Sequence, residues 1–214
     1  MNKLKVIHWF RQDLRLADNP SLFEAAKNSS ILPIYILDDI NPKELIMGAA
    51  SRFWLHHSLN SLNKSLDQNL SIYHGKPLEI LLEITDRLEI KEIYWNRCYE
   101  PWRIKRDTQI KKELESKGIK VTTLNGSLLW EPWTIKKADG TPYKVFTPFF
   151  RKGCLLSDEP RKPLPAPNNL DFLNDSKKSL EINDLALLPL VRWDIEMKPF
   201  WNIGEDGAHK RLTE

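Results

Sequence analysis

Two short stretches of this chain concentrate charged and aromatic side chains that could hold a ligand. The first runs from Trp9 to Pro20, follows a run of apolar residues, and includes Arg11 and Asp13. It contains no glycine, whereas a dinucleotide or P-loop phosphate site needs glycines so that backbone N–H groups can approach the phosphates. The stretch therefore disfavours that chemistry and predicts a ligand that is held by side chains.

The second stretch runs from Asn96 to Arg103, also follows an apolar run, and includes Cys98 and Glu100. In open α/β sheets, ligands bind beyond the carboxyl ends of the strands, at the point where the strand order reverses. In the usual doubly wound order the strands before the two stretches lie side by side there, so we expect one groove. Arginine suits acidic groups and aromatic rings suit flat faces, which predicts a planar, conjugated, partly anionic ligand.

Two more sites flank the expected groove. Asp38 and Asp39 end the second apolar run, and Ser51 and Arg52 open a long helix. The complete set of candidate ligand-binding residues is Trp9, Arg11, Asp13, Asp38, Arg52, Asn96, Cys98 and Glu100.

Several of these residues have an equally good structural explanation. Arg11 and Asp13 can pair with each other or with neighbouring loops, and Asn96 and Glu100 can be turn or capping groups. Cys98 can be an inert, small apolar residue. No nucleophile–base set or acid–base pair of carboxylates can be placed, and no Cys/His cluster has zinc spacing, so we expect no catalytic residue and no metal site.

The elements that must position these residues alternate between strand and helix. Apolar runs predict strands at Leu4–Phe10, Ile31–Leu37, Leu70–Tyr73, Glu92–Asn96 and Ile119–Leu124. Helical spacing and caps predict helices at Pro20–Lys27, Ala49–Leu66, Pro77–Leu88 and Ile104–Lys117. This alternation predicts an α/β fold with a doubly wound, five-stranded parallel sheet of the Rossmann-like kind.

The periodicity ends after Leu124, and the rest of the chain has a different character. We expect an α/β domain over 1–130, then an aromatic, turn-rich extension packed on it over 131–158. Four prolines between Pro160 and Pro167 predict a stiff linker rather than core, and with the polar residues after it this linker spans 159–198. The segment 199–214 is typical of a helix that is just beginning and lacks a partner to dock on.

Composition limits the function classes. The chain has 214 residues, 41% of them hydrophobic, which is enough for a real core. A formal net charge of +3 is too small to indicate nucleic-acid binding by itself, and no apolar run approaches the roughly 20 residues of a membrane span. Two cysteines do not suggest a disulfide scaffold, so we expect a reducing, cytoplasmic setting and no membrane partner.

Four motifs resemble those of the DNA photolyase/cryptochrome family in their residues and in their order along the chain. The resemblance is closest to the class I cyclobutane-pyrimidine-dimer photolyases. They are Trp9–Pro20 (WFRQDLRLADNP), Asn96–Pro101 followed by Arg106-Asp107, Gly140–Phe149 (GTPYKVFTPF), and Trp201–Leu212 (WNIGEDGAHKRL). The last has Ile203 where the family usually has proline. The four motifs together cover essentially the whole chain.

This resemblance implies the N-terminal antenna domain of a deoxyribodipyrimidine photolyase, which repairs pyrimidine dimers in DNA with light. It implies a partner, a C-terminal helical domain that holds FAD and contacts the damaged DNA, encoded in the same gene or separately. The chain alone would then lack the catalytic part. The alternative is a cryptochrome-like light-sensing or regulatory module without repair activity.

The resemblance also implies an antenna chromophore, with deazaflavin, FMN and methenyltetrahydrofolate as alternatives. Arg52 matches an arginine that family members place at a deazaflavin-type pigment. Cys98 falls where deazaflavin users have an acid, and Trp102-Arg103 where folate users tend to have Asn-Glu. Neither pigment pattern is complete.

Overall fold

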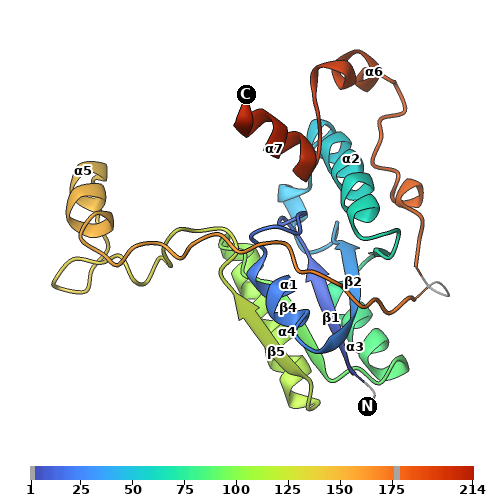
Figure 1. Cartoon of the computed structure of the whole chain (residues 1–214), viewed down its shortest axis with the longest axis horizontal. Helices are drawn as coiled ribbons and strands as arrows, with labels where there is room; N and C mark the ends of the chain where they lie inside the picture. The colour runs from blue at the N-terminus through green and yellow to red at the C-terminus, as the bar shows by residue number, and fades with distance from the viewer. Residues whose placement is uncertain (1–2, 176–178) are drawn as a thin grey trace. The chain divides into compact units, whose positions relative to one another are not determined.

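A computed structural model describes residues 3–175 and 179–214 of the chain. The protein forms two compact units, one made of Met1–Gly126 with Leu164–Glu214, the other of Ser127–Pro163. Figure 1 shows the sheet of the first unit with helices on both of its faces.

The sheet of the first unit is parallel throughout. Its strands are β1 (Leu4–Phe10), β2 (Ser29–Leu37), β3 (Ser71–His74), β4 (Glu92–Asn96) and β5 (Lys120–Leu124), in the order β3-β2-β1-β4-β5. The winding reverses between β1 and β4, which pair directly with His8 opposite Tyr94. The predicted fold class and the predicted neighbourhood of these two strands are confirmed.

Helices α1 to α4 cover the two faces of the sheet, and each face has its own hydrophobic core. Helices α1 (Pro20–Ala25) and α2 (Ala49–Ser65) pack on one face, and α3 (Pro77–Arg87) and α4 (Pro101–Ser116) on the other. Helix α1 is capped by Asn19, whose side chain accepts a hydrogen bond from the Leu22 amide. Helix α4 begins at Pro101, three residues before the predicted start, because proline is favoured at the first helical position.

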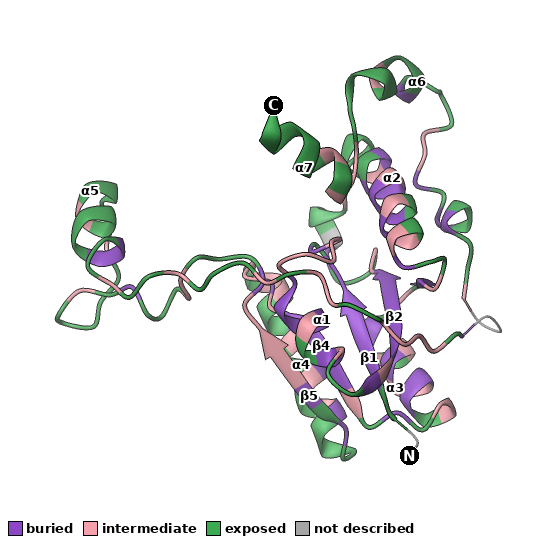
Figure 2. Cartoon of the chain, viewed as in Figure 1, coloured by how far each residue is buried: buried purple, intermediate pink, exposed green. Residues whose placement is uncertain are grey.

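The segment after Leu164 differs in part from the linker that the sequence predicts. Phe172 bridges to Ile31 of β2, and Ile182, Leu185 and Leu187 are buried in the same core as α1 and α2. Figure 2 shows buried positions along this segment beside the sheet. The scattered apolar residues of this predicted linker thus supply buried surface that holds it against the fold.

A buried ion pair fastens the same segment. Asp175, which is 3% exposed, accepts hydrogen bonds from Arg87 Nη1 and Nη2 at 2.7 and 2.6 Å and a short one from the Tyr73 hydroxyl. Tyr73 belongs to β3 and Arg87 is the last residue of α3, so both partners come from the α/β part of the unit. A buried carboxylate needs such partners, because it would otherwise be costly to remove from water.

Short turns and a final helix complete the first unit. They are η1 (Lys43–Leu45), η3 (Ile182–Leu185), α6 (Asp194–Met197), η4 (Lys198–Phe200) and α7 (Glu205–Thr213). A helix is thus present in the segment 199–214, as the sequence predicts.

The second unit is small and rich in aromatic residues. It contains α5 (Phe146–Pro148) and η2 (Phe149–Cys154), a single turn of wider π-helix. Trp130 Nε1 donates to the Asp158 carbonyl at 2.9 Å and so joins residues near its two ends. The structure places the predicted extension, 131–158, inside this unit.

No helix in the described chain is long and apolar enough to cross a membrane. Over residues 3–175 and 179–214, no three His, Cys, Asp or Glu side chains gather as metal ligands would.

Candidate functional site

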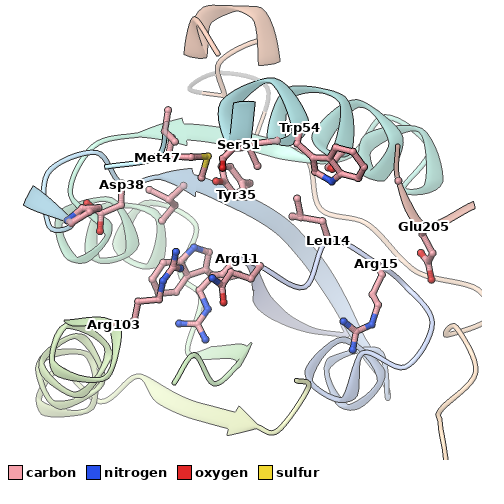
Figure 3. Close-up of a pocket in the computed structure, with 18 of the residues that line it drawn as sticks. Arg11, Leu14, Arg15, Tyr35, Asp38, Met47, Ser51, Trp54, Arg103 and Glu205 are labelled. Atoms are coloured by element: carbon pink, nitrogen blue, oxygen red, sulfur yellow. The ribbon is translucent and has the colours of Figure 1, made fainter. Parts of the chain in front are cut away.

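A groove with a volume of about 760 Å³ lies at the carboxyl ends of β1 and β2. Its walls come from α2, from the first turns of α4 and from α7. Figure 3 shows Ser51 and Trp54 projecting from α2 on one side, with Arg11 and Arg103 on the other. This volume is within the range of about 300–1,000 Å³ that is usual for small-molecule sites.

The floor of the groove holds a buried guanidinium with unused donors. The side chain of Arg11 is only 3% exposed, and its Nη1 donates a short hydrogen bond to Asp107. Its Nε and Nη2 are buried and have no hydrogen-bond partner among the described residues. Since buried polar groups are nearly always paired, these donors mark Arg11 as a candidate ligand contact.

Arginines and tryptophans alternate along one wall. The Arg106 guanidinium carbon lies 5.3 Å from the ring centre of Trp9 and 5.1 Å from that of Trp102, and the Arg103 carbon lies 4.6 Å from Trp102. The Arg11 guanidinium carbon lies 5.0 Å from the ring centre of Trp9, so it belongs to the same series of contacts. Such cation–π contacts hold the rings in place, so this wall is preorganised.

Two aspartates balance the charge of this wall. Arg106 Nη1 donates to Asp38 at 3.0 Å, and Arg106 Nη2 lies 2.8 Å from Asp107. Burial alone would lower the pKa of Arg106, but the carboxylates of Asp107 and Asp38 outweigh it and raise that pKa. Arg106 therefore stays charged, paired with both carboxylates.

The opposite wall is apolar with a few hydroxyls. Ser51, Trp54, Leu55 and Ser58 line the groove from one face of α2, and Trp54 is 41% exposed. Burial raises the pKa of Tyr35, which also lines the groove, so its phenol stays protonated and can donate.

Helix α7 closes one end of the groove. The Glu205 carboxylate accepts hydrogen bonds from the amides of Leu16 and Ala17 at 2.7 and 2.8 Å. Gly204 precedes it with φ of +111°, and a Cβ there would lie 2.1 Å from Ser61 Oγ of α2. The helix thus docks by its first turn on both the loop after β1 and α2.

The loops after β1 and β4 meet, as the sequence predicts. Asn96 Nδ2 donates to Asp13 Oδ2 at 2.5 Å and to Asn19 Oδ1 at 2.7 Å, and Gln12 donates to Glu100 at 2.7 Å. Asp13 and Asn96 are buried in this network and do not line the groove, and neither does Glu100. Their observed contacts hold the two loops in place.

The structure separates the other predicted residues. Trp9, Arg11 and Asp38 line the groove, whereas Arg52 and Cys98 do not. The Arg52 guanidinium lies 3.1–3.2 Å from the carboxylate oxygens of Asp39. Cys98 is 8% exposed, and burial raises the pKa of its thiol, so it stays protonated.

Ser51 was expected beside the groove, but Trp54, Leu55 and Ser58 were not predicted from the sequence. With Ser51 they follow the i, i+3, i+4, i+7 spacing of a single helix face, and that signal could have identified the α2 wall. Glu205 carried no comparable signal, because its partners are backbone amides 188 and 189 residues away in the chain.

The family model described as DNA photolyase matches residues 6–168. This chain belongs to the DNA photolyase family. It is 35% identical over 215 residues to a deoxyribodipyrimidine photo-lyase of Agrobacterium fabrum, covering 98% of this chain and 44% of the relative. It is 34% identical over 220 residues to Cryptochrome-2 of Arabidopsis thaliana, covering 98% and 36%.

The fold agrees with this family. A solved bacterial class III photolyase from Agrobacterium tumefaciens matches with a TM-score of 0.91 and 34% identity, covering all of this chain and 44% of the other. The chain therefore spans less than half the length of these relatives. The groove lining from Trp9 to Arg106 falls within the residues that the family model matches, and the lining from α7 lies beyond them.

Proposed function

We propose that this chain is the antenna-pigment-binding part of a light-driven enzyme that repairs pyrimidine dimers in DNA. The groove at the ends of β1 and β2 would hold a planar chromophore, and an FAD-binding helical domain would carry out the repair. Damaged DNA would be contacted through that domain.

The observation that carries the pigment assignment is Arg11. Its two unpartnered, buried donors need acceptor atoms, and deazaflavin, FMN and folate all carry carbonyl oxygens or ring nitrogens that could accept. The indoles of Trp54 and Trp102 both line the groove, and aromatic rings of this kind suit flat ring systems.

A titration of the purified 214-residue chain tests the pigment. FMN, a deazaflavin and methenyltetrahydrofolate are added separately, and binding is followed by chromophore fluorescence. We expect one of the three to bind at about one equivalent and to be quenched by the surrounding indoles. If none of them binds, the pigment assignment is wrong.

A pair of tryptophan variants tests the groove itself. Trp54→Ala removes one wall and should weaken pigment binding about tenfold, because a stacked aromatic contributes on the order of 1 kcal/mol beyond its buried area. Trp133→Ala, which removes an exposed indole from the second unit, is the matched control. Equal weakening by both variants would contradict the site.

A complementation assay in bacteria tests the repair function. The chain is co-expressed with the C-terminal portion of the Agrobacterium photolyase in bacteria that lack their own photolyase. We expect survival after ultraviolet exposure to rise under blue light and not in the dark. If survival is unchanged although the two parts form a stable complex, the cryptochrome-like function is favoured, which the similarity to Cryptochrome-2 also supports.

A further inference from the structure

A second cavity, separate from the pigment groove, lies where η4 and α7 pack on α2. Its volume is about 560 Å³, and its lining shares no residue with the groove described above. Three lysines line it from three different elements, namely Lys64 of α2, Lys198 of η4 and Lys210 of α7. We call this cavity the lysine pocket.

The positive charge of the lysine pocket is not neutralised within the protein. Among the described residues, none of the three lysines forms an ion pair, and Asp206 is the only acidic residue in the lining. Burial, and then the nearby charge of Lys198, lowers the pKa of His57. The pocket therefore presents a local excess of positive charge to a solvent-borne anion.

Two further side chains in the same lining, His57 and Trp201, could contact a ligand that carries both a negative charge and a flat ring. His57 lines the pocket, and its Nε2 is buried without a hydrogen-bond partner among the described residues. The Trp201 side chain, 54% exposed, offers an indole surface at the edge of the pocket. Lysines are established phosphate binders, and aromatic side chains stack on bases.

The backbone around the pocket is closely packed. A Cβ on Gly207 would lie 2.0 Å from the Asn202 carbonyl oxygen, so no other residue fits there without a backbone shift. Gly204 makes the close approach to Ser61 already described. Gly204 thus lets the start of α7 approach α2, and Gly207 lets α7 approach the segment that precedes it.

We propose that the lysine pocket binds a phosphate ester attached to a flat ring, such as a nucleotide, free or as part of a nucleic-acid strand. The lysines bind the phosphate oxygens, His57 adds one hydrogen bond, and Trp201 contacts the ring. This site is independent of the pigment groove.

The test uses the whole 214-residue chain at low ionic strength, because exposed charges are screened by salt. Inorganic pyrophosphate, ATP and a short single-stranded DNA are titrated separately, and binding is measured by calorimetry. Binding of ATP alone identifies a free nucleotide, and binding of the DNA with a strong salt dependence identifies a strand. If none of the three binds, the proposal is overturned.

Charge-matched variants locate the binding. Replacing Lys64, Lys198 and Lys210 together by Gln should weaken binding by roughly tenfold or more, since each is a charged hydrogen-bond donor. The same replacement of Lys105, Lys112 and Lys117, exposed lysines of α4 and its end, changes net charge equally and should have little effect. Equal weakening by both triple variants would overturn the proposal.

A third variant tests whether the positive charge of the lysine pocket attracts the ligand. Asp206→Asn removes the only carboxylate in the lining and should strengthen binding severalfold. All variants should keep the pigment affinity of the unmodified chain, so failure here and failure of the pigment assignment are distinguishable.

Discussion

Asn96 Nδ2 donates a 2.5 Å hydrogen bond to Asp13 Oδ2, which ties the end of β4 to the loop after β1. The side-chain oxygen of Asn96, Oδ1, accepts a hydrogen bond from the Ser21 N–H at 3.2 Å, so Asn96 also contacts the start of α1. Asp13 and Asn96 are 4% and 2% exposed. This pair holds the groove floor, with Arg11 two residues before Asp13.

Replacing Asn96 by Ala should destabilise the fold by about 2–3 kcal/mol. The substitution leaves the buried Asp13 carboxylate short of a donor, and an unsatisfied buried charge is more costly than a lost hydrogen bond. Urea unfolding measures the change. Asn183→Ala, at an exposed position, should change stability by less than about 0.5 kcal/mol. Similar losses for both variants would contradict the role of Asn96.

Replacing Glu205 by Ala should release the first turn of α7. The variant loses two hydrogen bonds from the Leu16 and Ala17 amides to a charged carboxylate. Each such hydrogen bond contributes about 1.5–3 kcal/mol to stability. We expect faster hydrogen exchange over 205–213 and weaker pigment binding, because α7 closes one end of the groove. Glu196→Ala, an exposed acid of α6, is the control and should change neither quantity.

Replacing Gly204 by Ala should disturb the same docking by a different route. The new Cβ meets Ser61 Oγ at 2.1 Å, and φ of +111° is unfavourable for alanine by roughly 1–2 kcal/mol. Adding Ser61→Gly removes the clash but not the backbone strain, so the double variant should recover part of the slow exchange over 205–213. Full recovery, or none, would show that only one of the two causes acts.

His8 should make the protein less stable in mild acid. Its ring is fully buried with Nε2 2.8 Å from Ser21 Oγ, and burial lowers its pKa from 6.5 to about 4. Because the folded state then binds fewer protons than the unfolded state, stability is full above pH 6.5 and falls as the pH drops towards 4. Between pH 7.5 and 5.0 the loss from this one group is about 2 kcal/mol.

A His8→Gln variant isolates this effect. Urea unfolding at pH 7.5 and pH 5.0 gives the pH-dependent part of the stability for each protein, whatever the variant's absolute stability. The variant should lose about 2 kcal/mol less than the unmodified chain over this interval. An unchanged pH dependence would show that His8 is not the source of the acid sensitivity.

The strands and most helices could be predicted because their signals are local. Apolar runs such as Val6–Phe10 specify buried strands, and Asn19 with Pro20 specifies a helix start within a few residues. The alternation of these elements determines a doubly wound sheet, and that order places the loops after β1 and β4 next to each other.

Which side chains face the groove could not be predicted in the same way. Ser51 lines it, while its neighbour Arg52 pairs with Asp39, since adjacent positions on a helix point about 100° apart. Asn96 and Asp13 satisfy each other instead of facing a ligand, because their burial depends on residues from three separate segments.

The amino-acid sequence by itself determined the family, the parallel sheet and the place of the ligand crevice, because these follow from local periodicity and from motifs in their chain order. Only the tertiary structure decided that Arg11 is left with buried unused donors, that Glu205 closes the groove, and that three distant lysines converge. Those features depend on contacts between residues that are far apart in the chain, and no local pattern encodes such contacts.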